Sequence, residues 1–101
     1  MENLVKKGMA NLWKGKEGVG GKLYLTSQQL THKPHKMNVQ NEEVTIHLSD
    51  IDHLEFYTNK VFGIPLMKNG LMVVDKDSRQ YKFVVNSRDK WKNEIEEQLK
   101  N

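Results

Sequence analysis

Alternating hydrophobic and polar positions, the pattern of a strand with one buried face, recur along most of the chain. The clearest case is residues 20–30, where Leu23 and Leu25 alternate with polar residues after two adjacent glycines. Glycines at that place suit a β-bulge or a close approach of two backbones. The same alternation predicts strands over residues 9–16, 19–26, 30–33, 44–48, 53–57, 71–74 and 80–85.

Glycine, proline and clusters of polar residues predict where these strands end. Residues 14–20 are a glycine-rich turn, and residues 34–43 are a long polar loop with the composition of a binding loop. Pro34 ends its strand or places it at a sheet edge, and Pro65 marks residues 64–66 as a short edge segment. Asn69-Gly70 is the strongest hairpin-turn signal in the chain.

The hydrophobic period changes from two to nearly four at the C-terminal end. Trp91, Ile95 and Leu99 are spaced four apart and form one stripe on a helix, with Ser87 as a suitable N-cap. Charged pairs four residues apart support the same helix; they are Lys90–Glu94, Lys92–Glu96 and Glu96–Lys100. Since so short a helix is not stable alone, we expect Trp91 to dock on the open end of the sheet.

About seven short strands followed by one amphipathic helix predict a mainly β fold, a small α+β barrel or sandwich plugged by the helix. The chain of 101 residues is long enough for one domain with one core. We expect that domain over residues 9–101, after a flexible lead-in over residues 1–8 in which Leu4 and Val5 form a short helical turn.

Composition is that of an ordinary soluble domain, with 37% hydrophobic and 29% charged residues. The chain has no cysteine, which excludes disulfides and thiolate chemistry and fits a reducing compartment. It has no signal-peptide pattern and no run of roughly 20 apolar residues that would span a membrane. We therefore expect an intracellular, cytoplasmic protein.

The net charge of +3 is unevenly distributed. Residues 1–36 hold seven lysines against two glutamates, a net charge of +5, whereas residues 37–101 carry a net charge of −2. A basic N-terminal third suits a phosphate-bearing partner, either lipid or nucleic acid. The alternative is a solubilising surface on which the lysines happen to be unevenly spread.

Motifs in a characteristic order carry a resemblance to a known family over nearly the whole chain, from Met9 to Leu99. They are Gly21-Lys22-Leu23-Tyr24-Leu25-Thr26, then Leu30 and Lys33-Pro34-His35-Lys36, then residues 46–51, 69–74, 81–85 and 88–91. In this order they resemble the GRAM domain family, most of all its stand-alone bacterial members. His32 stands where that family usually has a phenylalanine.

The resemblance implies a pleckstrin-homology-like (PH-like) fold, a bent barrel of seven strands capped by a C-terminal helix. It also implies a binding module without catalytic activity. Members of the family are associated with membrane lipids, especially phosphoinositides, or with protein partners.

Lysines beside the first hairpin are the leading candidates for a binding site. PH-like folds that bind inositol phosphates use basic residues there, and the matching residues with their extension are Lys14, Lys16, Lys22, Lys33, His35 and Lys36. Glycines of the same loop would offer backbone N–H groups to an anion. Because no arginine is present, the attraction is that of point charges without a bidentate grip. The leading hypothesis is peripheral association with anionic lipid headgroups.

Two other kinds of partner stay open. A strand edge, or an exposed aromatic side chain such as Trp13 or Phe62 with its neighbour Val61, would make the domain a protein-interaction module. Stacking on Trp13, Tyr24 and Tyr57 would instead suit single-stranded nucleic acid, which ranks lower because lysines and aromatic residues are not interleaved.

Metal binding and catalysis are not predicted. The histidines at positions 32, 35, 47 and 53 lack a fixed ligand spacing, so exposed structural histidines are favoured over a metal site, and whether His32 is buried stays open. Ser49, Asp50 and His47 are close in sequence, but neighbouring strand residues point in alternate directions and do not converge as a triad. Asp75 and Asp77 suit a turn. We expect no catalytic residue, cofactor or metal.

Overall fold

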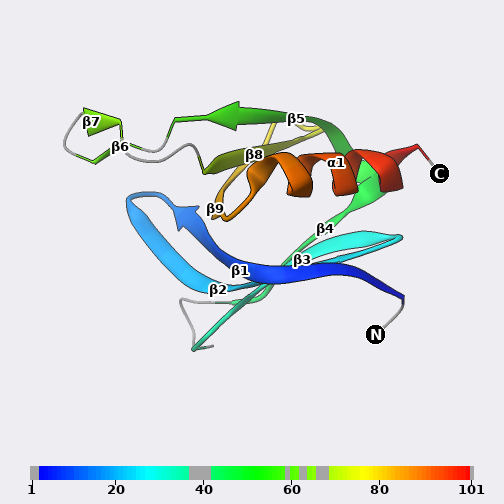
Figure 1. The fold of residues 1–101 in the computed structure, drawn as a ribbon, viewed down its shortest axis with the longest axis horizontal. Coiled ribbons are helices and arrows are strands. Elements are labelled where there is room, and N and C mark those ends of the chain that lie inside the picture. Colours follow the sequence, from blue (N-terminus) through cyan, green and yellow to red (C-terminus); the bar gives the residue numbers. More distant parts are fainter. Residues whose placement is uncertain (1–2, 37–41, 59, 62–63, 66–68, 101) are drawn as a thin grey trace.

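One curled antiparallel sheet and one helix make up the fold in the computed structural model (Figure 1), which describes residues 3–36, 42–58, 60–61, 64–65 and 69–100. The seven strands lie in the order β4-β3-β2-β1-β9-β8-β5. Their bounds are β1 Leu4–Lys14, β2 Glu17–Thr26, β3 Gln29–Pro34, β4 Val44–His47, β5 Ile51–Tyr57, β8 Gly70–Asp75 and β9 Gln80–Val85. A separate pair is formed by β6 (Lys60–Val61) and β7 (Ile64–Pro65).

The helix α1 (Arg88–Leu99) lies between the two layers of the curled sheet, and a short 3-10 helix, η1 (Leu48–Asp50), joins β4 to β5 (Figure 1). Trp91 is 2% exposed and Ile95 is fully buried. The predicted stripe of the helix therefore packs into the core. The predicted fold class, a mainly β half-barrel of seven strands with one C-terminal helix, is confirmed.

The core follows the predicted alternation. Leu23 and Leu25 of β2 are fully buried, and Phe83 and Val85 of β9 are almost so. Every residue of β8, which pairs with β5 on one side and with β9 on the other, is buried. The core thus runs through both halves of the sheet, which β1 joins by pairing with β2 on one side and β9 on the other.

The first strand begins earlier than predicted, at Leu4 rather than Met9. The predicted helical turn over Leu4 and Val5 is wrong, since both residues belong to β1. The reason is the length of β2, which supplies pairing partners as far as Thr26, opposite Leu4. Tertiary pairing has overridden a local sequence that carries no strong strand signal.

The glycine-rich turn predicted over residues 14–20 is present but much shorter. The turn is only Gly15-Lys16, with Gly15 in the left-handed region at φ 65°. Gly18 and Gly20 lie inside β2, paired with Trp13 and Asn11. Their backbone N–H groups are therefore part of a strand and do not form an open anion-binding loop.

Asn69-Gly70 is not a hairpin turn. Gly70 is the first residue of β8 and pairs with Tyr57 and with Val84. A Cβ at this position would lie 2.4 Å from the carbonyl oxygen of Tyr57, so glycine is needed for a close approach of two strands. Of the predicted edge segment 64–66, the first two residues form β7, and residue 66 lies outside the described residues.

The start of α1 differs from the expected N-cap geometry. Ser87 stands at the cap position with φ 56° and ψ 55°, and its side chain makes no capping hydrogen bond. Its carbonyl oxygen accepts hydrogen bonds from the backbone N–H groups of Lys90 and Trp91 at 3.0 and 3.2 Å. The predicted pair Lys92–Glu96 is present, with 2.9 Å between Nζ and Oε2.

Candidate anion-binding site

Lys22 and Lys33 lie directly opposite each other on β2 and β3. Lys22 is exposed and Lys33 half-buried, with its Nζ 5.1 Å from the centroid of the Tyr24 ring. Like charges at directly opposite positions of an antiparallel pair are destabilising. This pair therefore costs the fold some stability, and an anion bound between the two ammonium groups would remove that cost.

The same face of the sheet extends across β1. In the register of β1 with β2, Lys7 is opposite Tyr24 and Met9 is opposite Lys22, and cross-strand partners share a face. We call this surface the basic face; it consists of Lys7, Met9, Lys22, Tyr24 and Lys33. Met9 is 54% exposed, so the basic face has an apolar side chain beside its lysines.

Lys14 and Lys16 lie apart from the basic face. Lys14 is separated by two and four residues from Leu12 and Ala10, which are buried. Because side chains alternate along a strand, Lys14 lies on the same, inner side at the end of β1. Its Nζ donates a hydrogen bond to the carbonyl oxygen of Glu42 at 3.3 Å. Lys16 is exposed in the two-residue turn. The predicted residues thus fall into two groups, one at the hairpin turn and one on the outer face.

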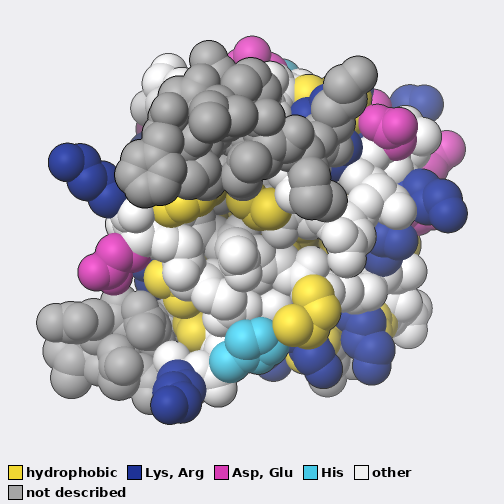
Figure 2. Space-filling model, turned by 60° about the vertical axis from the view of Figure 1, so that its left-hand side comes forward, with side chains coloured by type: hydrophobic (Ala, Val, Ile, Leu, Met, Phe, Trp, Pro, Cys, Tyr) yellow, Lys and Arg dark blue, Asp and Glu magenta, His cyan; other side chains and the backbone are white. Residues whose placement is uncertain are grey.

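His35 and Lys36 follow β3 and are both exposed. The backbone N–H of His35 donates to the carbonyl oxygen of Gly20 at 3.0 Å, and its ring lies 3.4 Å from the place of a Cβ on Gly20. This contact holds the imidazole on the outer side of β2. Figure 2 shows this end of the molecule, with basic side chains in its lower part beside a histidine, and acidic side chains toward the left and upper right margins.

His32 is part of the core, which decides between the two environments that the sequence left open for this residue. It is 1% exposed and lies beside Phe83, with 6.2 Å between ring centroids. Its Nε2–H donates to the carbonyl oxygen of Ala10 at 3.0 Å, whereas Nδ1 has no hydrogen-bond partner among the described residues. Burial lowers the pKa of this imidazole, and the nearby Lys14 acts in the same direction. His32 is therefore a neutral core residue.

The aromatic residues considered for nucleic-acid stacking are only partly exposed. Trp13, Tyr24 and Tyr57 are all half-buried. The hydroxyl of Tyr57 donates to the carbonyl oxygen of Phe83 at 2.9 Å, and burial raises the pKa of this phenol to about 12. The candidate pair Val61 and Phe62 lies outside the residues whose side chains are described.

Acidic and histidine side chains meet on β5. The Nδ1 of His53 lies 2.6 Å from Asp52, and its Nε2 lies 2.8 Å from Glu55. These two hydrogen bonds raise the pKa of His53, and the bond to Asp52 contributes most. All three side chains are exposed. Within the described part of the chain, no group of three or more histidine, aspartate or glutamate side chains is arranged to hold a metal ion.

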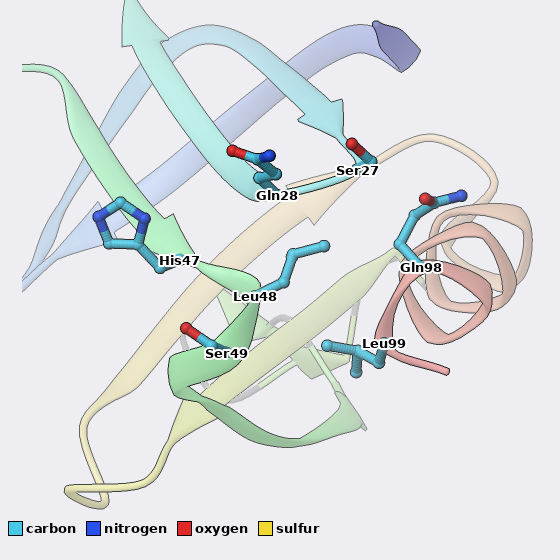
Figure 3. A pocket seen from close by; sticks show the side chains of 7 residues that line it. All are labelled: Ser27, Gln28, His47, Leu48, Ser49, Gln98 and Leu99. Atoms are coloured by element: carbon cyan, nitrogen blue, oxygen red, sulfur yellow. The ribbon is translucent and has the colours of Figure 1, made fainter. Parts of the chain in front are cut away.

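A separate hollow of about 390 Å³ lies at the other end of β2 (Figure 3). Its lining comes from the β2–β3 turn, from the junction of β4 with η1, and from the end of α1; it consists of Ser27, Gln28, His47, Leu48, Ser49, Gln98 and Leu99. No lysine or arginine lines it, so its chemistry does not suit an anion.

Lys7 and Met9 are the members of the basic face that sequence reasoning missed. Residues 1–8 were expected to precede the fold, and the register that places Lys7 and Met9 beside Tyr24 and Lys22 depends on long-range pairing. Local sequence offered no clear signal, since Lys7-Gly8-Met9-Ala10 does not alternate between polar and apolar residues.

Comparison with solved structures shows the PH-like fold. Similar chains include the C-terminal domain of an unknown protein from Leishmania infantum, with a TM-score of 0.80, 15% identity, and coverage of 99% of this chain and 86% of that chain. The N-terminal PH domain of human ARAP2 has a TM-score of 0.70 and 17% identity over 94% of this chain and 78% of that one. The Slm1 PH domain in complex with phosphoserine has a TM-score of 0.70 and 15% identity over 97% of both chains.

No protein-family model and no curated protein matches the sequence. At these identities the structural likeness shows the fold, and the chain is a domain of the PH-like class. Among the described residues, no helix is both long and apolar enough to cross a membrane.

Proposed function

We propose that this domain is a non-catalytic binding module of the GRAM type that associates peripherally with anionic membrane lipid. The basic residues proposed for the site form two groups; they are Lys22 and Lys33 on the outer face with His35 and Lys36 after β3, and Lys14 and Lys16 at the β1–β2 hairpin turn. The observation that carries the proposal is the directly opposed pair Lys22–Lys33 on an exposed face of the sheet. Two lysines at directly opposite positions of the sheet favour a phosphate-bearing ligand, since the ligand's charge offsets the repulsion between their like charges.

Three further features support a membrane surface as the source of that phosphate. Met9 lies beside Lys22 and is exposed, so an apolar group enters the interface together with the charges. Lys16 lies at the tip of the adjoining hairpin. The Slm1 PH domain was solved with phosphoserine, which combines a phosphate with an amino acid and is compatible with recognition of a headgroup by this fold.

Vesicle co-sedimentation tests the proposal. The domain is mixed with neutral vesicles and with vesicles that carry an anionic phospholipid, at low and at moderate salt. We expect binding to the anionic vesicles alone, and weaker binding as salt rises. Because each lysine near an anionic surface contributes about 1 kcal/mol, the double variant Lys22→Ala and Lys33→Ala should bind about 30-fold more weakly.

A charge-matched control separates a site from net charge. Lys76 is exposed in the β8–β9 turn and Lys100 is exposed at the end of α1. Their double replacement by alanine changes the net charge equally and should leave vesicle binding within about two-fold of the original. Equal loss in both double variants would indicate diffuse attraction, and absence of sedimentation at low salt would remove the membrane proposal altogether.

A protein-interaction module is the second candidate function, and one observation favours it. Phe56 of the edge strand β5 is 42% exposed. The guanidinium carbon of Arg88 lies 4.3 Å from the centroid of its ring. An exposed aromatic side chain on an unpaired strand edge is the kind of feature that a partner strand covers. Replacement of Phe56 by serine should abolish capture of such a partner and leave vesicle binding unchanged.

A further inference from the structure

The N-terminal half of β1 has a strand on one side only. Strand β2 pairs with β1 along its length, whereas β9 pairs only with residues 10–12. Within the described part of the chain, residues 4–9 therefore have an edge without a strand partner. Figure 1 shows this part of β1 extending away from β9 and running past α1. Alternate residues of such an edge offer their N–H and C=O groups to an added strand.

A hollow of about 270 Å³ lies against this edge, between β1 and the start of α1. Trp91 and Asn86 line it on the side of the helix, and residues 6–9 line it on the side of the strand. A Cβ on Gly8 would lie 3.4 Å from the Trp91 ring, so glycine leaves the ring close to the strand backbone. Space is thus available beside the edge, next to a rigid aromatic side chain.

Three lysines from two elements border the hollow, and no acidic residue is among its lining residues. The Nζ of Lys6 lies 5.2 Å from the centroid of the Trp91 ring, and Lys90 comes from the first turn of α1. Lys7 is the neighbour of Lys6 and projects from the opposite face of the sheet. Positive charge therefore lies on both sides of the unpaired edge.

Apolar side chains accompany these charges. Leu4 is 44%, Val5 36% and Met9 54% exposed, all on the same half of β1. Exposed apolar residues beside an unpaired edge add contact area for a docked strand. A second copy of this chain that presented the same edge would place lysines against lysines, which is unfavourable. The charges thus select an acidic partner.

We propose that residues 4–9 of β1 bind an acidic peptide in extended conformation, which adds as a strand beside β1. Its carboxylates meet Lys6 and Lys90 on the inner side of the sheet and Lys7 on the outer side. The ladder of main-chain hydrogen bonds supplies affinity, and the lysines supply selectivity for acidic side chains. The site adjoins the proposed lipid site, since the peptide occupies the edge of the sheet and the lipid its outer face, and Lys7 and Met9 belong to both surfaces.

Fluorescence polarisation with three labelled peptides tests the proposal. The first is an extended peptide of about eight residues, rich in glutamate and valine, which spans the edge. The second has glutamine in place of glutamate, and the third is the acidic peptide with every backbone nitrogen methylated. We expect binding of the first peptide alone, because the second lacks the charges and the third lacks the strand donors.

Variants of the protein locate the peptide. Replacement of both Lys6 and Lys90 by glutamate should weaken binding of the acidic peptide about ten-fold or more. The matched control, Lys76→Glu with Lys100→Glu, should leave it within about two-fold. Circular dichroism confirms that each variant is folded, and amide chemical shifts should change upon peptide addition at residues 4–9 and at the start of α1.

Several results would overturn the proposal. Equal binding of the glutamine peptide would exclude charge selection, and equal binding of the methylated peptide would exclude strand addition. Unchanged affinity in the Lys6 and Lys90 double variant, or shift changes confined to another surface, would exclude this edge. Concentration-dependent dimerisation that competes with the peptide would assign the edge to a second copy of the chain.

Discussion

Two neighbouring cross-strand pairs of β2 and β3 lie in opposite environments. Lys22–Lys33 projects from the outer face of the sheet, and Leu23–His32, one step along the same ladder, projects into the core. Lys22 is exposed, whereas Leu23 is 0% and His32 1% exposed. The backbone of both pairs is the same ladder, so the difference in environment comes from the two-residue alternation of the strands.

The comparison shows two ways in which the fold accommodates polar groups. In the core, burial keeps the imidazole of His32 neutral, and its Nε2–H satisfies a backbone carbonyl group. On the outer face, Lys22 is exposed to solvent, and the Nζ of Lys33 lies over the ring of Tyr24. The inner pair thus contributes to folding, whereas the outer pair opposes it slightly and offers binding.

The largest loss of stability is expected for a variant that disrupts both cross-strand pairs, Lys22–Lys33 and Leu23–His32, together. Gly21 precedes Lys22 on β2, and a Cβ at this position would lie 2.2 Å from the carbonyl oxygen of Lys33. Because that oxygen belongs to the backbone of β3, the two strands must separate to admit a methyl group. The Gly21→Ala variant should lose about 3 kcal/mol of unfolding free energy, measured by urea denaturation.

Gly18 supplies the matched control in the same strand. A Cβ there would meet only the Trp13 ring, at an ordinary contact distance of 3.8 Å. The Gly18→Ala variant should stay within about 1 kcal/mol of the original protein. Equal losses in the two variants would mean that strand propensity, not the close approach of β2 to β3, explains why glycine stands at position 21.

The inner pair should give the protein a dependence of stability on pH. The pKa of His32 in the folded state is lowered by burial from its ordinary value of 6.5. Below pH 6.5 the unfolded chain therefore binds a proton at this residue that the folded chain does not, and the unfolding free energy falls as the pH falls. Thermal unfolding followed from pH 7.5 to pH 5 should show this loss of stability.

His32→Phe is the variant that isolates the effect, since it keeps an aromatic ring beside Phe83 and removes the titrating group. The stability of this variant should fall less between pH 7.5 and pH 5 than that of the original protein. The exposed His53, whose pKa is raised by Asp52 and Glu55, acts in the opposite direction and is common to both proteins. Identical pH profiles would show that His32 is not the group responsible.

Periodicity was sufficient to predict most of the fold. The strands around Leu23, Leu25, Phe83 and Val85 and the helix with Trp91 are local patterns, and each was found from local spacing. The errors arose where long-range pairing decides the structure. Residues 4–8 became strand because β2 extends beside them, and Gly70 entered β8 because Tyr57 approaches it closely.

The candidate site was less predictable for the same reason. The sequence identifies Lys14, Lys16, Lys22 and Lys33 as basic residues near one hairpin, but the face on which each lies depends on strand register. The register of β1 with β2, which places Met9 beside Lys22 on the outer face, turns Lys14 toward the inner side. His32 is polar by residue type, and it becomes a core residue only because it lies on the same face of β3 as Leu30.

The smallest effect on stability should accompany a large effect on binding, in the Lys22→Glu variant. A glutamate opposite Lys33 replaces repulsion by attraction, which should raise the unfolding free energy by about 0.5 kcal/mol. The reciprocal change Lys33→Glu should stabilise less, because it also removes the contact with Tyr24. Both variants should lose sedimentation with anionic vesicles at low salt. If the Lys22→Glu variant is more stable and still binds the vesicles, the opposed lysines do not serve lipid binding. If the variant is less stable than the original protein, Lys22 and Lys33 do not repel each other.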